Sequence, residues 1–265
     1  MTGDLCLTLA DVTVRIAPEA GGRISGLAVD GTELLRQGEH YGCFPMAPWC
    51  GRMREGRFSV EGVEYQLPLN APPHAIHGTA RDGVWDIVEA SETQAVLTRP
   101  LSAPWPFVGR VTQEVRLSEH ALALEMEIVS DAERFPAQAG WHPWFLRRPR
   151  PDTPSATIDF APTWQEVRGA DYLPTGERIA PVPGPWDDCF GMPDGVDVTL
   201  EWPELLRLRV RSPQRWVVVY DLEDAAICVE PQSGPPNGLN TMPTFVEPGR
   251  PLRVQTEWSW ERLTR

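Results

Sequence analysis

Residues 121–128 read Ala121-Leu122-Ala123-Leu124-Glu125-Met126-Glu127-Ile128. The even-numbered positions of this run are all large and apolar, whereas positions 125 and 127 are glutamates. Successive side chains of an extended strand point to opposite faces, so a period of two places the apolar residues on one face and the glutamates on the other. The run therefore predicts an antiparallel strand with one buried and one exposed face.

The same alternation recurs at residues 12–16, 206–210 and 252–260. Residues 216–220 and 226–229 are unbroken apolar runs, which are typical of central strands buried on both faces. The 22 glycines and 28 prolines interrupt the chain often and leave few windows for a long helix. With more than ten strand candidates, the sequence predicts an all-β sandwich or barrel of mostly antiparallel strands with few short helices.

The proline-rich stretch at residues 147–154 is the part of the chain that most resembles a linker. It could divide the chain into two domains, or it could be a long loop within one. The strand pattern is the same on both sides of it, which favours the loop. We therefore predict a single domain over residues 1–265.

Composition excludes several classes of function. The formal net charge of −13 makes nucleic acid an improbable partner, because an acidic surface repels phosphate backbones. The chain contains no lysine, so Schiff-base chemistry, pyridoxal phosphate attachment and a phosphate-binding P-loop are excluded. Neither an HExxH motif nor a close cluster of cysteine and histidine is present, nor is a GxSxG elbow. We expect no metal and no other cofactor.

The cysteines and the start of the chain indicate a cytoplasmic protein. Five cysteines are scattered without CxxC spacing, which favours reduced thiols, and we expect each to be a small buried side chain. The first residues lack the basic and apolar regions of a signal peptide, and no stretch approaches the length of a membrane span. The sequence does not determine the oligomeric state.

Four short segments place polar residues in aromatic or glycine-rich surroundings. His77 precedes a glycine and, taken alone, reads best as a loop histidine that caps a carbonyl. His142 lies between two tryptophans and could equally be a core residue or a catalyst. Asp187 and Asp188 are adjacent carboxylates, which are often turn residues. Glu230 is the strongest candidate, because a carboxylate at the end of an apolar strand is costly unless it is paired or functional.

In this order the segments resemble the aldose 1-epimerase (galactose mutarotase) family over nearly the whole chain. The matching stretches are residues 47–53 and 56–58, His77-Gly78, His142-Pro143-Trp144-Phe145, Asp187-Asp188-Cys189-Phe190, and Glu230-Pro231-Gln232-Ser233-Gly234-Pro235-Pro236. Gly51 stands where the family has asparagine, and Trp144 replaces the usual tyrosine. The resemblance implies the galactose-mutarotase-like β-supersandwich and a sugar substrate.

The resemblance also implies residue roles. Glu230 is the expected general base and His142 the expected general acid in the interconversion of the α and β anomers of an aldohexose. Arg52, His77 and Asp187 are expected to bind the sugar, with Asp188 as the fallback for Asp187, and Trp144 and Arg81 to contact it. An ionised Glu230 beside a protonated His142 predicts a bell-shaped dependence of rate on pH. The reading from residues alone left open a salt bridge between Glu230 and Arg52.

Two other functions fit some of the residues. The segment from His77 to Arg81 is similar to that of hexose-6-phosphate 1-epimerases, in which the arginine binds phosphate, and Arg54, Arg57 and Arg81 could form a phosphate-binding patch. A non-catalytic carbohydrate-binding module would share the tryptophans and Asp187. Such a module would not need both Glu230 and His142.

Overall fold

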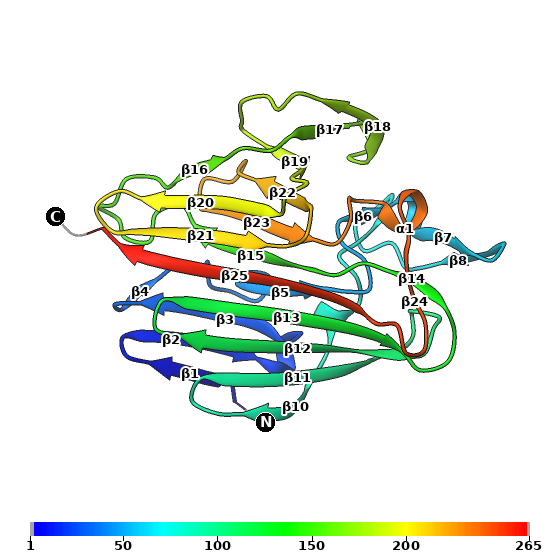
Figure 1. Cartoon of the computed structure of the whole chain (residues 1–265), viewed down its shortest axis with the longest axis horizontal. Helices are drawn as coiled ribbons and strands as arrows, with labels where there is room; N and C mark the ends of the chain where they lie inside the picture. The colour runs from blue at the N-terminus through cyan, green and yellow to red at the C-terminus, as the bar shows by residue number, and fades with distance from the viewer. Residues whose placement is uncertain (1–2, 264–265) are drawn as a thin grey trace.

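The computed structural model describes residues 3–263 and consists mainly of two large antiparallel sheets (Figure 1). The larger sheet has the strand order β1 (Leu5–Leu9), β2 (Val12–Ala17), β3 (Arg23–Val29), β5 (Cys43–Met46), β15 (Gly140–Leu146), β23 (Ala226–Gln232), β22 (Trp216–Tyr220), β19 (Asp187–Gly191), β17 (Trp164–Arg168) and β18 (Pro174–Ile179), with β4 (Thr32–Glu33) paired to β3. The smaller sheet has the order β10 (Asp86–Ala90), β11 (Gln94–Leu101), β12 (Gly109–Ser118), β13 (Ala121–Ser130), β25 (Leu252–Arg262), β21 (Leu206–Ser212), β20 (Val196–Trp202) and β16 (Thr157–Phe160).

Short elements complete the chain. Three two-stranded sheets are formed by β6 (Arg52–Met53) with β9 (Ala75–Ile76), β7 (Arg57–Val60) with β8 (Val63–Gln66), and β14 (Phe135–Ala137) with β24 (Thr244–Val246). Helical structure within residues 3–263 is limited to α1 (Gly238–Thr241) and to single 3₁₀ turns at Pro18–Ala20, Arg54–Gly56 and Ala80–Asp82. None of the helices in this part of the chain is long and apolar enough to span a membrane.

The two sheets stack face to face and share one hydrophobic core. Phe145 on β15 and Trp258 on β25 meet across this interface with ring centroids 5.0 Å apart, and both side chains are fully buried. The loop at residues 147–154 carries the chain from β15 in the larger sheet to β16 in the smaller one. Apolar packing therefore joins the two sheets, together with buried hydrogen bonds such as the one that Trp141 Nε1 donates to Gln113 Oε1 over 2.8 Å.

The alternating run at 121–128 is confirmed as part of β13. Its even-numbered apolar residues are at most 1% exposed, whereas the intervening residues are partly exposed. Strands β12 and β25 flank β13 over nearly its whole length, so the apolar face of all three strands continues without a break. The period of two in the sequence thus determines which face of the smaller sheet meets the core.

Two expectations about burial need correction. Strand β23 is buried throughout, as predicted, but Val218 and Tyr220 on β22 are only partly buried, because this face of the strand borders an open cleft. Four cysteines are buried, whereas Cys6 is exposed, because it lies on the outer face of the edge strand β1 while its neighbour Leu7 joins the core. None of the five cysteines forms a disulfide.

Candidate active site

Strands β15, β23, β22 and β19 hold the candidate site on the face of the larger sheet that is turned away from the core. On β15, Trp141 and Phe145 join the core, so the intervening His142 and Trp144 project from the opposite face. On β23, Ile227 and Val229 face the core in the same way. The alternate residues Cys228, Glu230 and Gln232 therefore lie on the site face. The register pairs Gly140 with Gln232 and Trp144 with Cys228, which puts His142 opposite Glu230.

These side chains open into a cleft of about 230 Å³. Ligand pockets for drug-sized molecules usually span about 300–1,000 Å³, so this cleft suits one small molecule such as a single sugar ring. Six of the predicted residues line it, namely Arg52, His77, His142, Trp144, Asp187 and Glu230, together with Asp188. A larger and more open groove of about 770 Å³ lies on the outer face of the smaller sheet, but it is lined by exposed ion pairs such as Arg209–Asp197.

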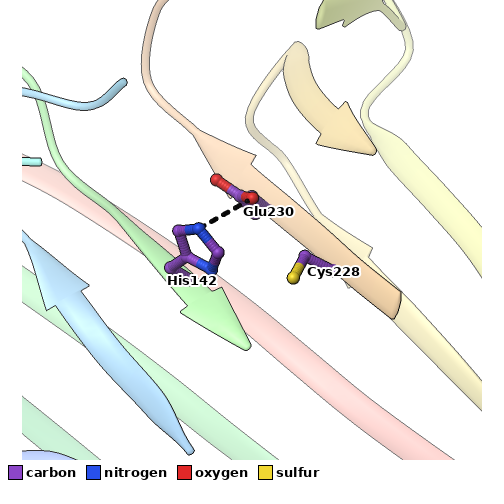
Figure 2. A group of neighbouring side chains, drawn as sticks. All are labelled: His142, Cys228 and Glu230. Atoms are coloured by element: carbon purple, nitrogen blue, oxygen red, sulfur yellow. Dashed lines mark ion pairs between the residues drawn. The ribbon is translucent and has the colours of Figure 1, made fainter. Parts of the chain in front are cut away.

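His142 and Glu230 form the centre of the cleft. The His142 Nε2 atom lies 3.3 Å from the Glu230 Oε1 atom, and the residues are 7% and 3% exposed. Figure 2 shows the two side chains pointing toward each other from the neighbouring strands β15 and β23. Glu230 therefore pairs with the histidine, and the alternative of a salt bridge to Arg52 is not formed.

Burial changes the protonation of this pair. It lowers the pKa of His142 to about 3, and the positive charge of Arg81 contributes to the same shift. Burial also raises the pKa of Glu230 well above its usual value, an effect that Asp187 increases and Arg52 opposes. Both shifts disfavour the charged form. The free cleft thus favours a protonated Glu230 beside a neutral His142, whereas the sequence analysis expected the ion pair.

His77 is brought to the site by two interlocked loops. Its backbone has a φ of +63°, and its amide donates to the Gly51 carbonyl oxygen over 3.0 Å. The next residue, Gly78, approaches so closely that an added Cβ would lie 2.0 Å from the Ala47 carbonyl oxygen, so only glycine fits. The His77 ring packs edge-on against His142 with centroids 4.9 Å apart, and its Nδ1 has no hydrogen-bond partner among residues 3–263. Burial lowers the pKa of His77 well below its usual value, so the ring is neutral.

Arg52 enters the cleft from β6. Its carbonyl oxygen accepts a hydrogen bond from the Asn237 amide over 2.6 Å, which ties β6 to the loop that follows Glu230. Its guanidinium stacks on the Tyr172 ring at 4.7 Å. Gly51 before it has a φ of +60°, and an added Cβ would lie 3.0 Å from Pro236. A larger side chain at position 51 would have to displace that proline.

Asp187 and Asp188 both line the cleft, and the choice of Asp187 as the sugar contact stays a prediction. Asp187 pairs in register with Tyr220, and its carboxylate forms an ion pair with Arg168. Asp188 pairs in register with Val219, and its carboxylate accepts a hydrogen bond from the Asp187 amide over 3.3 Å. Asp187 is also the residue whose charge reaches Glu230.

Trp144 forms one wall of the cleft. Its ring stacks on His142 at 5.0 Å with the planes 16° apart, and it meets Tyr220 edge-on at 5.8 Å. The indole Nε1 atom is buried and has no hydrogen-bond partner within the described part of the chain. An aromatic wall with a polar tip suits a ligand that presents both C–H and hydroxyl groups.

Arg81 is not among the residues that line the cleft, and its contact with the sugar stays a prediction. Its guanidinium lies over the Phe44 ring at 5.1 Å, behind His77 and beside Arg23. The sequence left open a phosphate-binding patch of Arg54, Arg57 and Arg81. Arg54 pairs with Asp171 at 3.0 Å, Arg57 donates to Gln66 over 2.9 Å, and the groove that these two arginines line does not include Arg81.

The hairpin of β17 and β18 supplies cleft residues that the sequence analysis missed. Glu166 accepts a hydrogen bond from Arg178 over 2.8 Å, while Arg168 holds Asp187. Tyr172 at the tip lies between Arg52 and Arg168, 4.7 and 5.1 Å from their guanidinium carbons. The alternation of tryptophan, glutamate and arginine at positions 164, 166 and 168 was the available signal, since it marks a polar strand face.

Solved structures with the same fold include a candidate aldose 1-epimerase from Escherichia coli K12, with a TM-score of 0.86 and 22% identity over 98% of this chain and 99% of that one. Galactose 1-epimerase from Lactobacillus acidophilus NCFM aligns with a TM-score of 0.81 and 16% identity over 98% and 94% of the two chains. The predicted fold class, a galactose-mutarotase-like β-supersandwich, is confirmed.

Two uncharacterized proteins of Escherichia coli K12 are similar in sequence. YphB is 33% identical over 142 residues, which span 50% of this chain and only 48% of that protein. YihR is 28% identical over 236 residues, or 79% of this chain and 76% of that protein. The family model described as aldose 1-epimerase matches residues 6–259. The chain therefore belongs to the aldose 1-epimerase family.

Proposed function

We propose that the protein is an aldose 1-epimerase that interconverts the anomers of a free aldohexose. The observation that carries the proposal is the buried His142–Glu230 pair, with 3.3 Å between Nε2 and Oε1, at the centre of a cleft sized for one sugar ring. In a cyclic aldose the C1 hydroxyl and the ring oxygen are bonded to the same carbon. Two adjacent proton-transfer groups can therefore reach both oxygens without a cofactor.

Ring opening needs two proton transfers. The Glu230 carboxylate removes the proton of the C1 hydroxyl, the C1–ring oxygen bond breaks, and His142 gives a proton to the ring oxygen as it leaves. The product is the open aldehyde, with Glu230 protonated and His142 neutral. After rotation about the C1–C2 bond, His142 removes the proton of the C5 hydroxyl as its oxygen attacks C1, and Glu230 returns a proton to O1.

The pair therefore shares one proton and alternates between two states. The charged state begins ring opening, and the neutral state begins ring closure. Burial favours the neutral state in the free cleft. We infer that the bound sugar brings the two states closer in free energy, because its hydroxyls hydrogen-bond to the carboxylate. In this proposal Arg52, His77 and Asp187, which line the cleft, hold the remaining hydroxyls so that the reacting atoms stay aligned.

The test is anomer exchange measured by NMR or polarimetry with glucose and galactose. We expect the purified protein to accelerate exchange catalytically, in proportion to its concentration. Sugar binding without acceleration would instead indicate a non-catalytic carbohydrate-binding module. Neither binding nor acceleration with any aldose would reject both functions.

A sugar 6-phosphate is the second candidate substrate, and one observation favours it. Arg23 and Arg81 lie over the same ring of Phe44, at 5.8 and 5.1 Å, next to the cleft. Burial and the neighbouring charge of Arg81 lower the pKa of Arg23, and an anion between the two guanidinium groups would relieve that repulsion. Comparing glucose with glucose 6-phosphate separates the candidates. A large preference for the phosphate, lost in Arg81→Ala, would replace the free sugar as the substrate.

We infer a cytoplasmic location because all five cysteines are free thiols, and four of them are buried. Free thiols are typical of reducing compartments. The acidic net charge argues against nucleic acid as a partner. The expected partner is the small sugar itself. Thiol titration of protein isolated without reductant provides a check, since five titratable thiols after unfolding are expected.

A further inference from the structure

Three side chains of the kinds that bind metal ions lie close together: His142 and Glu230 line the cleft, and Cys228 is buried beside them. One ligand atom each from His142, Cys228 and Glu230 lies within 4.8 Å of the others, and all three residues are buried. Figure 2 shows Cys228 on β23 together with Glu230, on the side of the strand that His142 approaches. The proposed proton transfers use the histidine and the glutamate, but they give the thiol no role.

The spacing suits a small thiophilic cation. Zinc binds thiolate sulfur at about 2.3 Å, and it binds imidazole nitrogen and carboxylate oxygen at about 2.0–2.2 Å, so its tetrahedral ligand atoms lie about 3.3–3.8 Å apart. The His142 Nε2 and Glu230 Oε1 atoms are already 3.3 Å apart. The other two separations, which are at most 4.8 Å, have to close by about an ångström, which is within the reach of side-chain rotation.

An independent observation concerns the histidine. His142 is 7% exposed, and its Nδ1 atom has no hydrogen-bond partner in the part of the chain that the structure describes. The ring packs against Trp144 and His77 with its Nε2 atom already directed at Glu230, so little movement of the imidazole is needed for Nε2 to bind an ion. The position of Cys228 is also favourable, because it is paired in register with Trp144 on one side and Tyr220 on the other, and both of these residues line the cleft.

We propose that His142, Cys228 and Glu230 form a binding site for a thiophilic divalent cation such as Zn²⁺, and that the bound ion stops epimerisation. On binding, the S–H bond of Cys228 and the O–H bond of the protonated Glu230 break, both protons leave to solvent, and sulfur–metal and oxygen–metal bonds form without any change of oxidation state. The mixed nitrogen, oxygen and sulfur ligands favour zinc or cadmium over magnesium or calcium. The metal occupies the lone pairs that His142 and Glu230 need for proton transfer.

The first experiment measures binding without turnover. We expect titration of the full chain with Cd²⁺ to give the ultraviolet charge-transfer band of a cadmium thiolate, and Cys228→Ser to lose it. Cys43→Ser is the matched control, because Cys43 is equally buried but belongs to the core cluster, and it should keep the band. No band in the wild type, or the same band in Cys228→Ser, would overturn the proposal.

A second experiment covers the case in which Cys228→Ser fails to fold. Zinc affinity is measured by competition with a chromophoric chelator in Glu230→Gln, which keeps the size of the side chain but removes its charge. Loss of one ligand should weaken binding by about 100-fold or more, by comparison with the 10–100-fold cost of losing an outer-shell partner. An unchanged affinity would overturn the site.

The inhibition, unlike the binding, rests on the proposed function. Zn²⁺ should inhibit anomer exchange in the wild type, a saturating sugar should protect, and Cys228→Ala should resist. A protein that binds cadmium through Cys228 but exchanges no anomers would reject the proposed function alone. An active enzyme that zinc does not inhibit would reject this inference alone.

Discussion

The two faces of β15 and β23 differ sharply although they belong to the same strands. The core face presents Trp141, Phe145 and Val229, which pack against the smaller sheet and are at most 1% exposed. The cleft face presents His142 and Glu230, which are nearly as buried but titratable. Burial alone therefore does not distinguish the core from the site.

Burial has opposite energetic signs on the two faces. Each large apolar side chain on the core face stabilises the fold by about 1.5–3 kcal/mol. On the cleft face, a carboxyl and an imidazole are removed from water, and each is held in its neutral form at a cost to stability. The stability gained from apolar burial on the core face offsets the cost of burying His142 and Glu230 on the cleft face.

The largest expected effect is on catalysis at the cleft face. Glu230→Gln keeps the shape of the side chain but removes the base, so kcat for anomer exchange should fall by about 100- to 10,000-fold while the fold is retained. NMR exchange spectroscopy measures this. A variant that keeps near wild-type kcat would show that Glu230 is not the proton acceptor.

The matching change on the core face should affect stability instead. Phe145→Ala removes the partner of Trp258 in the interface between the sheets and should cost about 3–5 kcal/mol of unfolding free energy. Urea denaturation measures the loss, with Val88→Ala on the exposed strand β10 as the control. A cost below about 1 kcal/mol would mean that the two sheets do not depend on this contact.

The pH dependence of stability should reveal the strain on the cleft face. Above the ordinary pKa of a glutamate, the unfolded chain ionises while folded Glu230, whose pKa is raised, does not, so the wild type loses stability as pH rises. Glu230→Gln removes this loss and should gain about 0.5–2 kcal/mol at neutral pH.

His142, whose pKa is lowered to about 3, acts in the opposite direction. Below the ordinary pKa of histidine the unfolded chain gains a proton that the folded chain does not, so stability falls as pH decreases from about 6.5 toward 3. His142→Asn should flatten this limb of the stability curve. Identical pH profiles of Tm for the variants and the wild type would contradict the assigned shifts.

A smaller effect is expected on the wall of the cleft. Arg168→Ala leaves the Asp187 carboxylate without its partner, so the aspartate should position the sugar less well. We expect KM to rise by roughly 10-fold, the equivalent of one charge-assisted hydrogen bond, with kcat nearly unchanged. Steady-state kinetics with Arg168→Lys for comparison measures this, and a loss confined to kcat would place Arg168 in the chemistry instead.

The smallest effect is expected on the outer face of the smaller sheet. Asp197→Asn breaks an exposed pair with Arg209, in which both side chains are more than 40% exposed. Such pairs contribute about 0–1 kcal/mol, and catalysis should be unchanged. A marked loss of activity would indicate that the groove on that face takes part in function.

Much of this arrangement could be predicted from local sequence. The alternation at 121–128 determines the buried face of β13, because the side-chain period of a strand is two. Glu230 stood out because a carboxylate ended an apolar strand. The order of the motifs indicates the family, and the family resemblance predicts that a set of further residues belongs to the site. Local sequence context alone does not predict this for these residues, which all line the cleft: His142, Arg52, His77 and Asp187.

Only the tertiary structure decided how these residues meet. The register of β15 against β23 brings His142 to Glu230, and residues on the separate hairpin of β17 and β18 close the cleft. The tertiary structure also determines that Arg81 lies outside the residues that line the cleft and that Cys6 is exposed. Cys228 lies beside the His142–Glu230 pair. Strand periodicity is a local property that a sequence carries directly. Burial, and with it the protonation of Glu230 and His142, depends on every segment that excludes water from the site.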